Sequence, residues 1–211
     1  MRCVLKGETK MRKLVTGLFV GVVALGVSAS AYAECTCKAI DASGTGWCAD
    51  CKHGKVFFVE IGSEGLFKAL QGTKMKAEDI KCPGCKTAFE KNGSCDKCHV
   101  TFCDGTCYKS FVSAAMAPGK ATDPATIKCP ACKSAAEGKS EGSYCEPCKG
   151  GFVGRYMFAA KDAYEAAKKA MTVLATATKT KCETCATAMV TNGTCEHCKV
   201  TYKNGEKVNK S

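Results

Sequence analysis

Residues 157–174 carry hydrophobic and polar positions at helical spacing. Apolar side chains recur there at alternating intervals of three and four residues, which places them on one face of an α-helix. Polar and charged residues fill most of the other positions, so the pattern indicates an amphipathic helix with one buried face. We expect that face to pack against a neighbouring part of the protein rather than to bind a cofactor. Its members are Met157, Ala160, Tyr164, Ala167, Met171 and Leu174.

Elsewhere the hydrophobic pattern consists of short runs that favour strands and short helices. Ser63 is placed to cap a helix that ends at Gly72, and Asp104 to cap one that stops at Pro118. A single large core is not expected, because much of the hydrophobic fraction of 45% is alanine and cysteine. The strand-like runs are KVFFVEI (55–61), VTF (100–102), GGFVGRYMF (150–158) and VTY (200–202).

Pairs of cysteines precede the strand-like runs and divide the chain into four copies of one unit. The second copy has CPGC, the spacer KTAFEKNGS and CDKC, and the fourth has CETC, ATAMVTNGT and CEHC. The third copy has a longer spacer, and the first opens with Cys35-Thr36-Cys37 in place of a full Cys-x-x-Cys. Such self-similarity is typical of a tandem array. The predicted boundaries are 34–81, 82–128, 129–181 and a truncated fourth copy at 182–211.

An Asn-Gly pair stands near the end of the spacer in the second copy and in the fourth. Asn-Gly between short segments favours a β-hairpin, because both residues of its tight turn have positive φ. A hairpin returns its two ends to one edge, so the flanking cysteine pairs are expected to converge. Units of this size bury too little surface to fold without a metal or disulfides. The predicted fold class is a small metal- or disulfide-stapled α+β chain of tandem β-hairpins linked by short helices.

Two Cys-x-x-Cys turns that meet across a hairpin supply four thiolates at tetrahedral spacing, the arrangement that zinc prefers. On these residues the chain resembles the zinc-ribbon superfamily, in which two such turns hold one structural zinc ion. The resemblance covers the second, third and fourth copies and part of the first. It implies up to four zinc ions, with the ligands Cys35, Cys37, Cys48 and Cys51; Cys82, Cys85, Cys95 and Cys98; Cys129, Cys132, Cys145 and Cys148; and Cys182, Cys185, Cys195 and Cys198.

Three other cysteine chemistries compete with zinc. In an oxidising compartment the same converging cysteines form disulfides. Tetrahedral sulfur sites also bind iron, and Cys-Pro-x-Cys resembles the rubredoxin turn, although rubredoxin-type proteins separate their turns by longer segments. The stretch CDKCH (95–99) matches the attachment motif of c-type haem, with His99 as the axial ligand. Lys149 and Lys199 stand at the position of His99 in the third and fourth copies, so haem would require a separate explanation for one copy.

Cys103 and Cys107 fall outside the repeated pattern. Their spacing places them on one face at the start of the helix expected after Asp104. One hypothesis is a disulfide between them or to a neighbouring cysteine. The other is a redox pair, because a helix N-terminus lowers the pKa of a thiol.

Residues 1–33 have the pattern of a signal peptide: basic residues at 11–13, an apolar core at 14–27 and Ala31-Tyr32-Ala33 before a cleavage site at Glu34. The expected mature protein is periplasmic or secreted and has no stable membrane span. Cleavage takes the formal net charge from +11 to about +7, and four zinc ions bound by thiolates would bring it to about −1. We therefore expect no nucleic-acid partner, and the sequence identifies no protein partner.

No serine-histidine-aspartate, phosphate-loop or paired-carboxylate pattern accompanies the cysteines. A zinc ion held by four thiolates has no open position for a substrate. The sequence thus predicts an exported, non-enzymatic zinc-binding repeat protein that acts as a structural or interaction scaffold. The alternatives are a disulfide-rich exported protein without metal, and an electron-transfer protein with c-type haem or rubredoxin-like iron.

Overall fold

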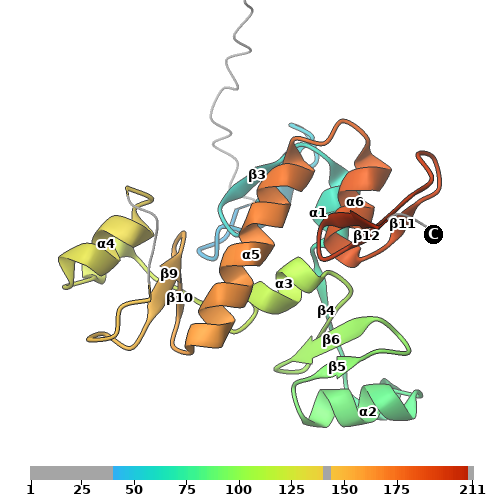
Figure 1. Cartoon of the computed structure of the whole chain (residues 1–211), viewed down its shortest axis with the longest axis horizontal. Coiled ribbons are helices and arrows are strands. Elements are labelled where there is room, and N and C mark those ends of the chain that lie inside the picture. Colours follow the sequence, from blue (N-terminus) through green and yellow to red (C-terminus); the bar gives the residue numbers. More distant parts are fainter. Residues whose placement is uncertain (1–39, 140–143, 209–211) are drawn as a thin grey trace, which may run out of the picture. The chain divides into compact units, whose positions relative to one another are not determined.

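A β-hairpin followed by a helix recurs along the chain. The computed structural model describes residues 40–139 and 144–208, and its strands form four small antiparallel sheets (Figure 1). The small α+β class predicted from the sequence is confirmed. The hairpins and the helices that follow them are β2 (His53–Val56) and β3 (Val59–Ile61) with α1 (Glu64–Ala69), β6 (Val100–Cys103) and β7 (Thr106–Tyr108) with α3 (Phe111–Met116), β9 (Gly151–Val153) and β10 (Tyr156–Phe158) with α5 (Lys161–Thr178), and lastly β12 (Val200–Lys203) and β13 (Glu206–Val208).

A shorter helix precedes each of the last three hairpins and carries a Cys-x-x-Cys at its start. Proline is the first residue of two of these helices, where its fixed φ favours helix initiation. Short strands follow and pair with the hairpins, as β1 (Gly46–Cys48) does with β2 in the first copy. The helices are α2 (Pro83–Glu90), α4 (Pro130–Ala136) and α6 (Glu183–Thr191), and the short strands are β5 (Ser94–Cys95) and β11 (Thr194–Cys195).

The spacers between the cysteine pairs are these helices, so the prediction of a hairpin at Asn-Gly is wrong. In the fourth copy Asn192 has a φ of 55° and ends α6, and the N–H of Gly193 donates to the carbonyl of Ala188 at 2.9 Å. The second copy repeats this geometry. Left-handed backbone serves a helix C-cap as well as a hairpin turn, so the same two residues fit both elements.

The hairpins lie after the second cysteine pair of each copy. In the second and fourth copies the two-residue turns of these hairpins are Asp104–Gly105 and Asn204–Gly205, and all four residues have positive φ. The helix expected from Asp104 begins instead at Phe111, with the Ser110 hydroxyl capping it. The strand-like run 55–61 likewise folds into two strands with a turn between them. The predicted N-cap at Ser63 is confirmed, because its hydroxyl accepts a hydrogen bond from the N–H of Leu66 at 3.1 Å.

The predicted long amphipathic helix is confirmed as α5. Tyr164, Ala167 and Leu174 are buried on one face, and that face packs against α3 and α6. The stripe extends beyond the helix at its start, because Met157 lies in β10 and Ala160 is the N-cap. Within the described residues, no helix combines the length and apolar content needed to cross a membrane.

Strands from one copy complete the sheet of the next. β4 (Gly72–Lys74) follows α1 and pairs with β7, and β8 (Lys120–Ala121) follows α3 and pairs with β10. A turn of 3-10 helix then leads to the next cysteine pair, at Ala77–Asp79 and at Pro124–Thr126. Successive copies are therefore joined by backbone hydrogen bonds as well as by the chain.

The largest buried cluster combines residues of the first, second and fourth copies with α5. It includes Leu66 of α1, Val112 of α3, Leu174 of α5 and Val190 of α6. The second and third copies each also have a small cluster of their own beside their cysteines. All described residues belong to one compact unit.

Candidate metal centre

Three groups of four cysteines converge in the structure. Within each group all four sulfurs lie within 4.8 Å of one another, close enough to hold a metal ion. The first cysteine is the N-cap of a short helix and the second lies in the first turn of that helix. The third and fourth lie before the hairpin. The groups are Cys82, Cys85, Cys95 and Cys98; Cys129, Cys132, Cys145 and Cys148; and Cys182, Cys185, Cys195 and Cys198.

The sulfur separations in the fourth copy match a tetrahedral metal site. The Sγ of Cys182 lies 3.8 Å from the Sγ of Cys195 and 3.8 Å from that of Cys198. Two thiolates bound at ~2.3 Å to one tetrahedral zinc ion lie about 3.8 Å apart. A disulfide requires ~2.05 Å between its sulfurs, so both separations from the Sγ of Cys182 are too long for a disulfide.

The second cysteine pair of each copy forms the same turn. In the fourth copy the N–H of Cys198 points at the Sγ of Cys195 (3.3 Å), and in the first copy the N–H of Cys51 points at the Sγ of Cys48 (3.5 Å). Such N–H contacts stabilise thiolate charge. The residue after the turn is left-handed in all four copies, namely Lys52, His99, Lys149 and Lys199.

The position of His99, which is the same as that of the lysines in the other copies, bears on the haem hypothesis. His99 has a φ of 52°, and the lysine after the turn in the fourth copy has a φ of 54°. The preceding cysteines, Cys95 and Cys98, converge with Cys82 and Cys85 into one four-sulfur group. His99 therefore occupies a position of the repeated turn, and the four-sulfur arrangement favours one metal ion over a haem attachment at this place.

The helix termini give the thiols of each group different acidities. Cys82, Cys129 and Cys182 accept hydrogen bonds first of all from the N–H of the second cysteine in the same turn, which lowers the pKa of each to about 7. Burial raises the pKa of Cys85 and Cys132. The first thiol of each group is therefore easier to ionise than an ordinary cysteine, and a cation among the sulfurs would favour the ionised form of the buried Cys85 and Cys132.

In the fourth group, the pKa of a further thiol is raised, that of Cys198. Hydrogen bonding with Cys185 raises the pKa of Cys198 to about 12. Burial comes first among the causes that raise the pKa of Tyr202 to about 12, and the neighbouring sulfurs add to it. Tyr202 packs in the same cluster as Cys185 and Cys195. The sequence pattern did not single out this tyrosine, although its counterpart Phe102 stands at the equivalent place in the second copy.

The first copy is described only in part. Cys48 ends β1 and Cys51 follows in the turn, as the third and fourth cysteines do in the other copies. Cys35 and Cys37 lie outside the described residues. The fourth predicted site therefore stays a prediction.

Cys103 and Cys107 do not lie at the start of a helix, so that prediction is wrong. They lie on the two strands of the hairpin β6–β7, where Cys107 is opposite Phe102 and Cys103 is opposite Thr106. Neighbouring residues of a strand point to opposite faces, so the two cysteines are on different faces of the sheet. Burial raises the pKa of both thiols. This geometry removes the basis for a reactive pair at a helix N-terminus.

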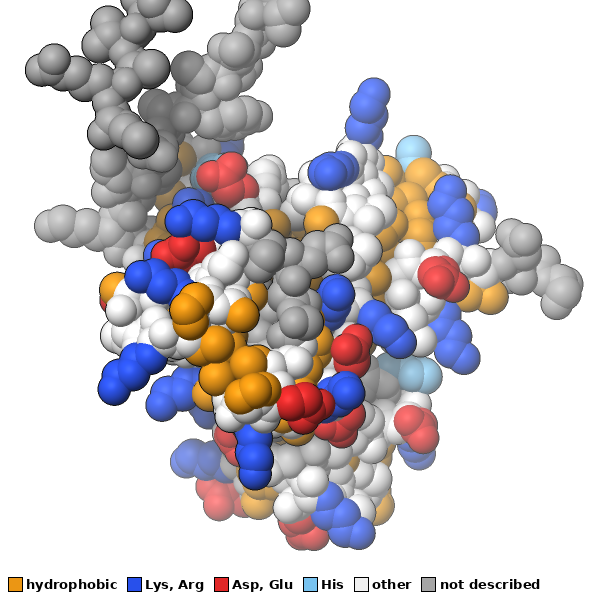
Figure 2. All heavy atoms as spheres, turned by 60° about the vertical axis from the view of Figure 1, so that its left-hand side comes forward, with side chains coloured by type: hydrophobic (Ala, Val, Ile, Leu, Met, Phe, Trp, Pro, Cys, Tyr) orange, Lys and Arg blue, Asp and Glu red, His pale blue; other side chains and the backbone are white. Residues whose placement is uncertain are grey.

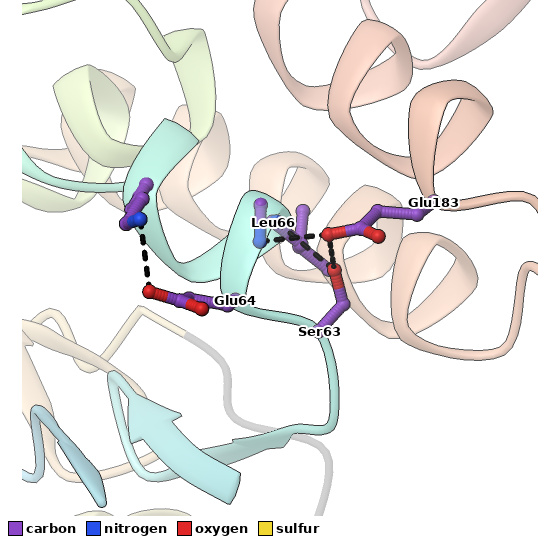
Figure 3. A network of polar contacts seen from close by, with 6 residues as sticks. Ser63, Glu64, Leu66 and Glu183 are labelled. Carbon is purple, nitrogen blue, oxygen red and sulfur yellow. Dashed lines mark hydrogen bonds and ion pairs between the residues drawn. The ribbon is translucent and has the colours of Figure 1, made fainter. Parts of the chain in front are cut away.

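Glu183 connects the start of α6 to the first copy, and Figure 3 shows its carboxylate beside Ser63. It follows Cys182 directly, and its Oε1 accepts hydrogen bonds from the Ser63 hydroxyl (2.6 Å) and from the N–H of Gly65 (2.7 Å). Hydrogen bonding from Ser63 lowers the pKa of this carboxyl. Glu183 and Ser63 thus cap α1 together, and the chain segment that carries the first cysteine of the group is held against α1.

No known protein family, curated protein or solved structure matches the chain.

Proposed function

We propose that this chain is an exported, non-enzymatic scaffold protein that holds one zinc ion in each of its four-cysteine groups. The observation that carries the proposal is the convergence of four sulfurs within 4.8 Å, repeated three times along the described chain. A fourth ion is proposed for Cys35, Cys37, Cys48 and Cys51. The repeat supports a common metal role, because one arrangement of sulfurs recurs in copies whose other residues differ.

Zinc is the metal that this donor set fits best. Four thiolates in a tetrahedral arrangement favour zinc over cations that prefer oxygen ligands. A zinc ion bound by four cysteines stabilises the fold and leaves no coordination position for a substrate, which supports a structural role and argues against catalysis. A bound metal ion would stabilise the thiolate form of cysteines whose pKa values are otherwise raised by burial.

Export is supported by the pattern of residues 1–33, and it places the mature protein in the periplasm or outside the cell. Lysine and arginine side chains are interspersed with acidic ones on the face drawn in Figure 2, which favours a protein partner over a nucleic acid. A scaffold role accords with modules that are joined through shared sheets and a shared core.

The test is elemental analysis of mature protein purified from the cell envelope, together with a thiol count after unfolding. We expect one zinc ion per four-cysteine group, and loss of one ion in Cys85→Ser, Cys132→Ser or Cys185→Ser. Cys107→Ser is the control and leaves the zinc content unchanged. If the protein contains neither metal nor free thiols, the cysteines form disulfides and the zinc proposal is wrong. If it contains iron or shows a haem absorbance band, the protein transfers electrons and the scaffold proposal is wrong.

A further inference from the structure

Two hairpins in the described chain receive an extra strand from the copy before them. β4 pairs with β7 along Gly72–Lys74, and β8 pairs with β10 along Lys120–Ala121. In both cases the added strand lies on the outer edge of the second hairpin strand and precedes the cysteine pair of the same copy. The sheets of the second and third copies therefore have a strand at this edge.

The fourth copy lacks that strand among the described residues. Its sheet has the order β11-β12-β13, so β13 is an edge strand. The reason lies in the preceding copy, where α5 continues to Thr178 and leaves only a short connection before Cys182. The residues that form a strand after α1 and α3 are helical here. The open edge is thus a consequence of the length of α5.

A groove with a volume of about 1040 Å³ runs along this edge, between β13, α3 and α5. Glu206, Lys207 and Val208 all line it. Side chains of consecutive strand residues point to opposite faces, so three in a row are the lining expected of a groove that follows the edge of the strand. Val208 is 44% exposed and is the most exposed large hydrophobic side chain in the described part of the chain. The unpaired N–H and C=O groups of an open strand edge form a surface to which a partner strand can add.

The second copy shows what covers the equivalent position. Tyr108 corresponds to Val208, and β4 places Gly72 opposite it. A Cβ on Gly72 would come within about 2.5 Å of the Tyr108 ring, so the added strand packs closely there. Main-chain pairing supplies affinity in such strand addition, and alternate side chains supply specificity.

The charges beside the groove select the kind of strand. Lys169, Lys203 and Lys207 line it, against one carboxylate, Glu206. Its apolar lining comes from side chains such as Phe111 and Val173. We propose that β13 is the docking site for an extended acidic segment of a partner protein, which adds to the sheet as an antiparallel strand. The proposal deepens the scaffold role and rests on it, because the metal-held fourth copy presents this edge.

The register of the hairpin shows which backbone groups would bind the segment. Lys203 and Glu206 flank the two-residue turn and Tyr202 is opposite Lys207. In an antiparallel pair the residues alternate between hydrogen-bonded and non-hydrogen-bonded positions. The N–H and the carbonyl of Lys207 therefore point outward, as those of Cys107 do toward Thr73 of β4. An acidic residue opposite Lys207 would add an ion pair to these two hydrogen bonds.

Fluorescence anisotropy with a synthetic peptide tests the proposal on the full-length mature protein. The probe has about ten residues of alternating glutamate and valine, labelled with fluorescein. We expect saturable binding that weakens as salt rises. Lys207→Pro removes the outward N–H without touching the β12–β13 pairing and weakens binding at least about tenfold. Lys207→Ala keeps the N–H and weakens binding about threefold.

The matched control is Glu60→Pro. Glu60 has the same register in β3 as Lys207 has in β13, opposite Lys55 in a hairpin with a two-residue turn. We expect this variant to bind the peptide as the wild type does. A second control is the same peptide with lysine in place of glutamate, which should not bind.

Zinc content is measured on every variant, so a failure of the scaffold is recognised separately from a failure of strand addition. Protein with its zinc ions that does not bind the acidic peptide overturns the proposal, and so does equal binding by wild type and Lys207→Pro. Sedimentation velocity adds a third outcome. A wild-type dimer that Lys207→Pro dissociates, with no peptide bound, would assign the edge to a second copy of this chain and overturn the acidic partner.

Discussion

At the residue scale, the most informative positions are those with left-handed backbone. Asn92 and Asn192 lie at the ends of the cysteine-bearing helices, and their side chains form hydrogen bonds with the turns of the hairpins that follow. The Oδ1 of Asn192 accepts a hydrogen bond from the N–H of Asn204 at 2.6 Å, and that of Asn92 from the N–H of Asp104 at 2.9 Å. Each asparagine therefore ties the end of a helix to the turn of the hairpin that follows.

Two substitutions at Asn192 separate its backbone role from its side-chain role. Asn192→Gly keeps the φ of 55° accessible and loses only the hydrogen bond to Asn204, at a cost of about 1 kcal/mol in the free energy of unfolding. Asn192→Ala also replaces a residue that tolerates the left-handed region with one that does not, and costs about 1 kcal/mol more. Urea unfolding of the zinc-loaded protein measures both.

Equal destabilisation by glycine and alanine would contradict this assignment, because it would mean that the backbone strain contributes nothing. Thr194, which is exposed in β11, offers a control: Thr194→Ala loses only a contact with Thr201 at the surface. We expect a change within about 0.5 kcal/mol for that variant.

At the element scale, α1 depends on a cap from a distant part of the chain. α1 spans only Glu64–Ala69, too short to be stable on its own. Ser63 caps it locally, and Glu183 caps it from the start of α6. Local sequence revealed the first contact because a serine before an apolar run is a helix-start signal. It did not reveal the second, which joins residues far apart in the chain.

A double-mutant cycle tests whether the two caps act together. Ser63→Ala and Glu183→Ala should each lower the free energy of unfolding by about 1 kcal/mol. Because the two side chains are hydrogen-bonded at 2.6 Å, the double variant should lose less than the sum of the single losses, by at least about 0.5 kcal/mol.

Glu64→Ala is the matched control for the cycle. Glu64 forms an exposed ion pair with Lys68 at 2.8 Å on the same helix (Figure 3). Exposed pairs of this kind contribute about 0.3–0.5 kcal/mol. Strict additivity of Ser63→Ala with Glu183→Ala would show that their contact does not contribute to stability.

At the scale of the whole molecule, the copies contribute unequally to the core. The sulfurs of Cys185 and Cys195 lie in the largest cluster, together with Leu174 of α5 and Val112 of α3. Cys85 and Cys95 lie in a small cluster that belongs to the second copy. The fourth metal group is therefore part of the shared core, although it is the last in the sequence.

Loss of one ligand should thus have different effects in different copies. We expect Cys195→Ser to lower the global free energy of unfolding by about 3 kcal/mol or more, because a metal-dependent module loses its ion within the shared core. Cys95→Ser should unfold only the part of the second copy around its small cluster, which includes α2 and excludes α3. Hydrogen exchange followed by mass spectrometry distinguishes these outcomes, since α5 should lose protection only in Cys195→Ser.

Equal loss of protection in α5 in both variants would contradict the division into a shared core and a separate small cluster. Cys107→Ser serves as the control for the serine substitution itself. This cysteine lies beside the second cluster without belonging to a four-cysteine group. Its variant should keep both its zinc content and the protection of α5.

The sequence by itself determined which cysteines of the second, third and fourth copies belong together. A spacing of two residues between cysteines keeps their sulfurs within reach of one ion whatever surrounds them. Because the same two pairs recur in three copies, one explanation applies to all of them. It also determined the buried face of α5 and the cap at Ser63, because both signals arise from neighbouring residues.

Only the tertiary structure decided what the spacers are, where Cys103 and Cys107 lie, and which edge stays open. Asn-Gly supplies a left-handed backbone that ends a helix as readily as it turns a hairpin, so the choice depended on packing rather than on the two residues. β4 and β8 pair with strands of another copy, and Glu183 caps α1 from another copy. Such contacts depend on hydrogen bonding between segments far apart in the sequence.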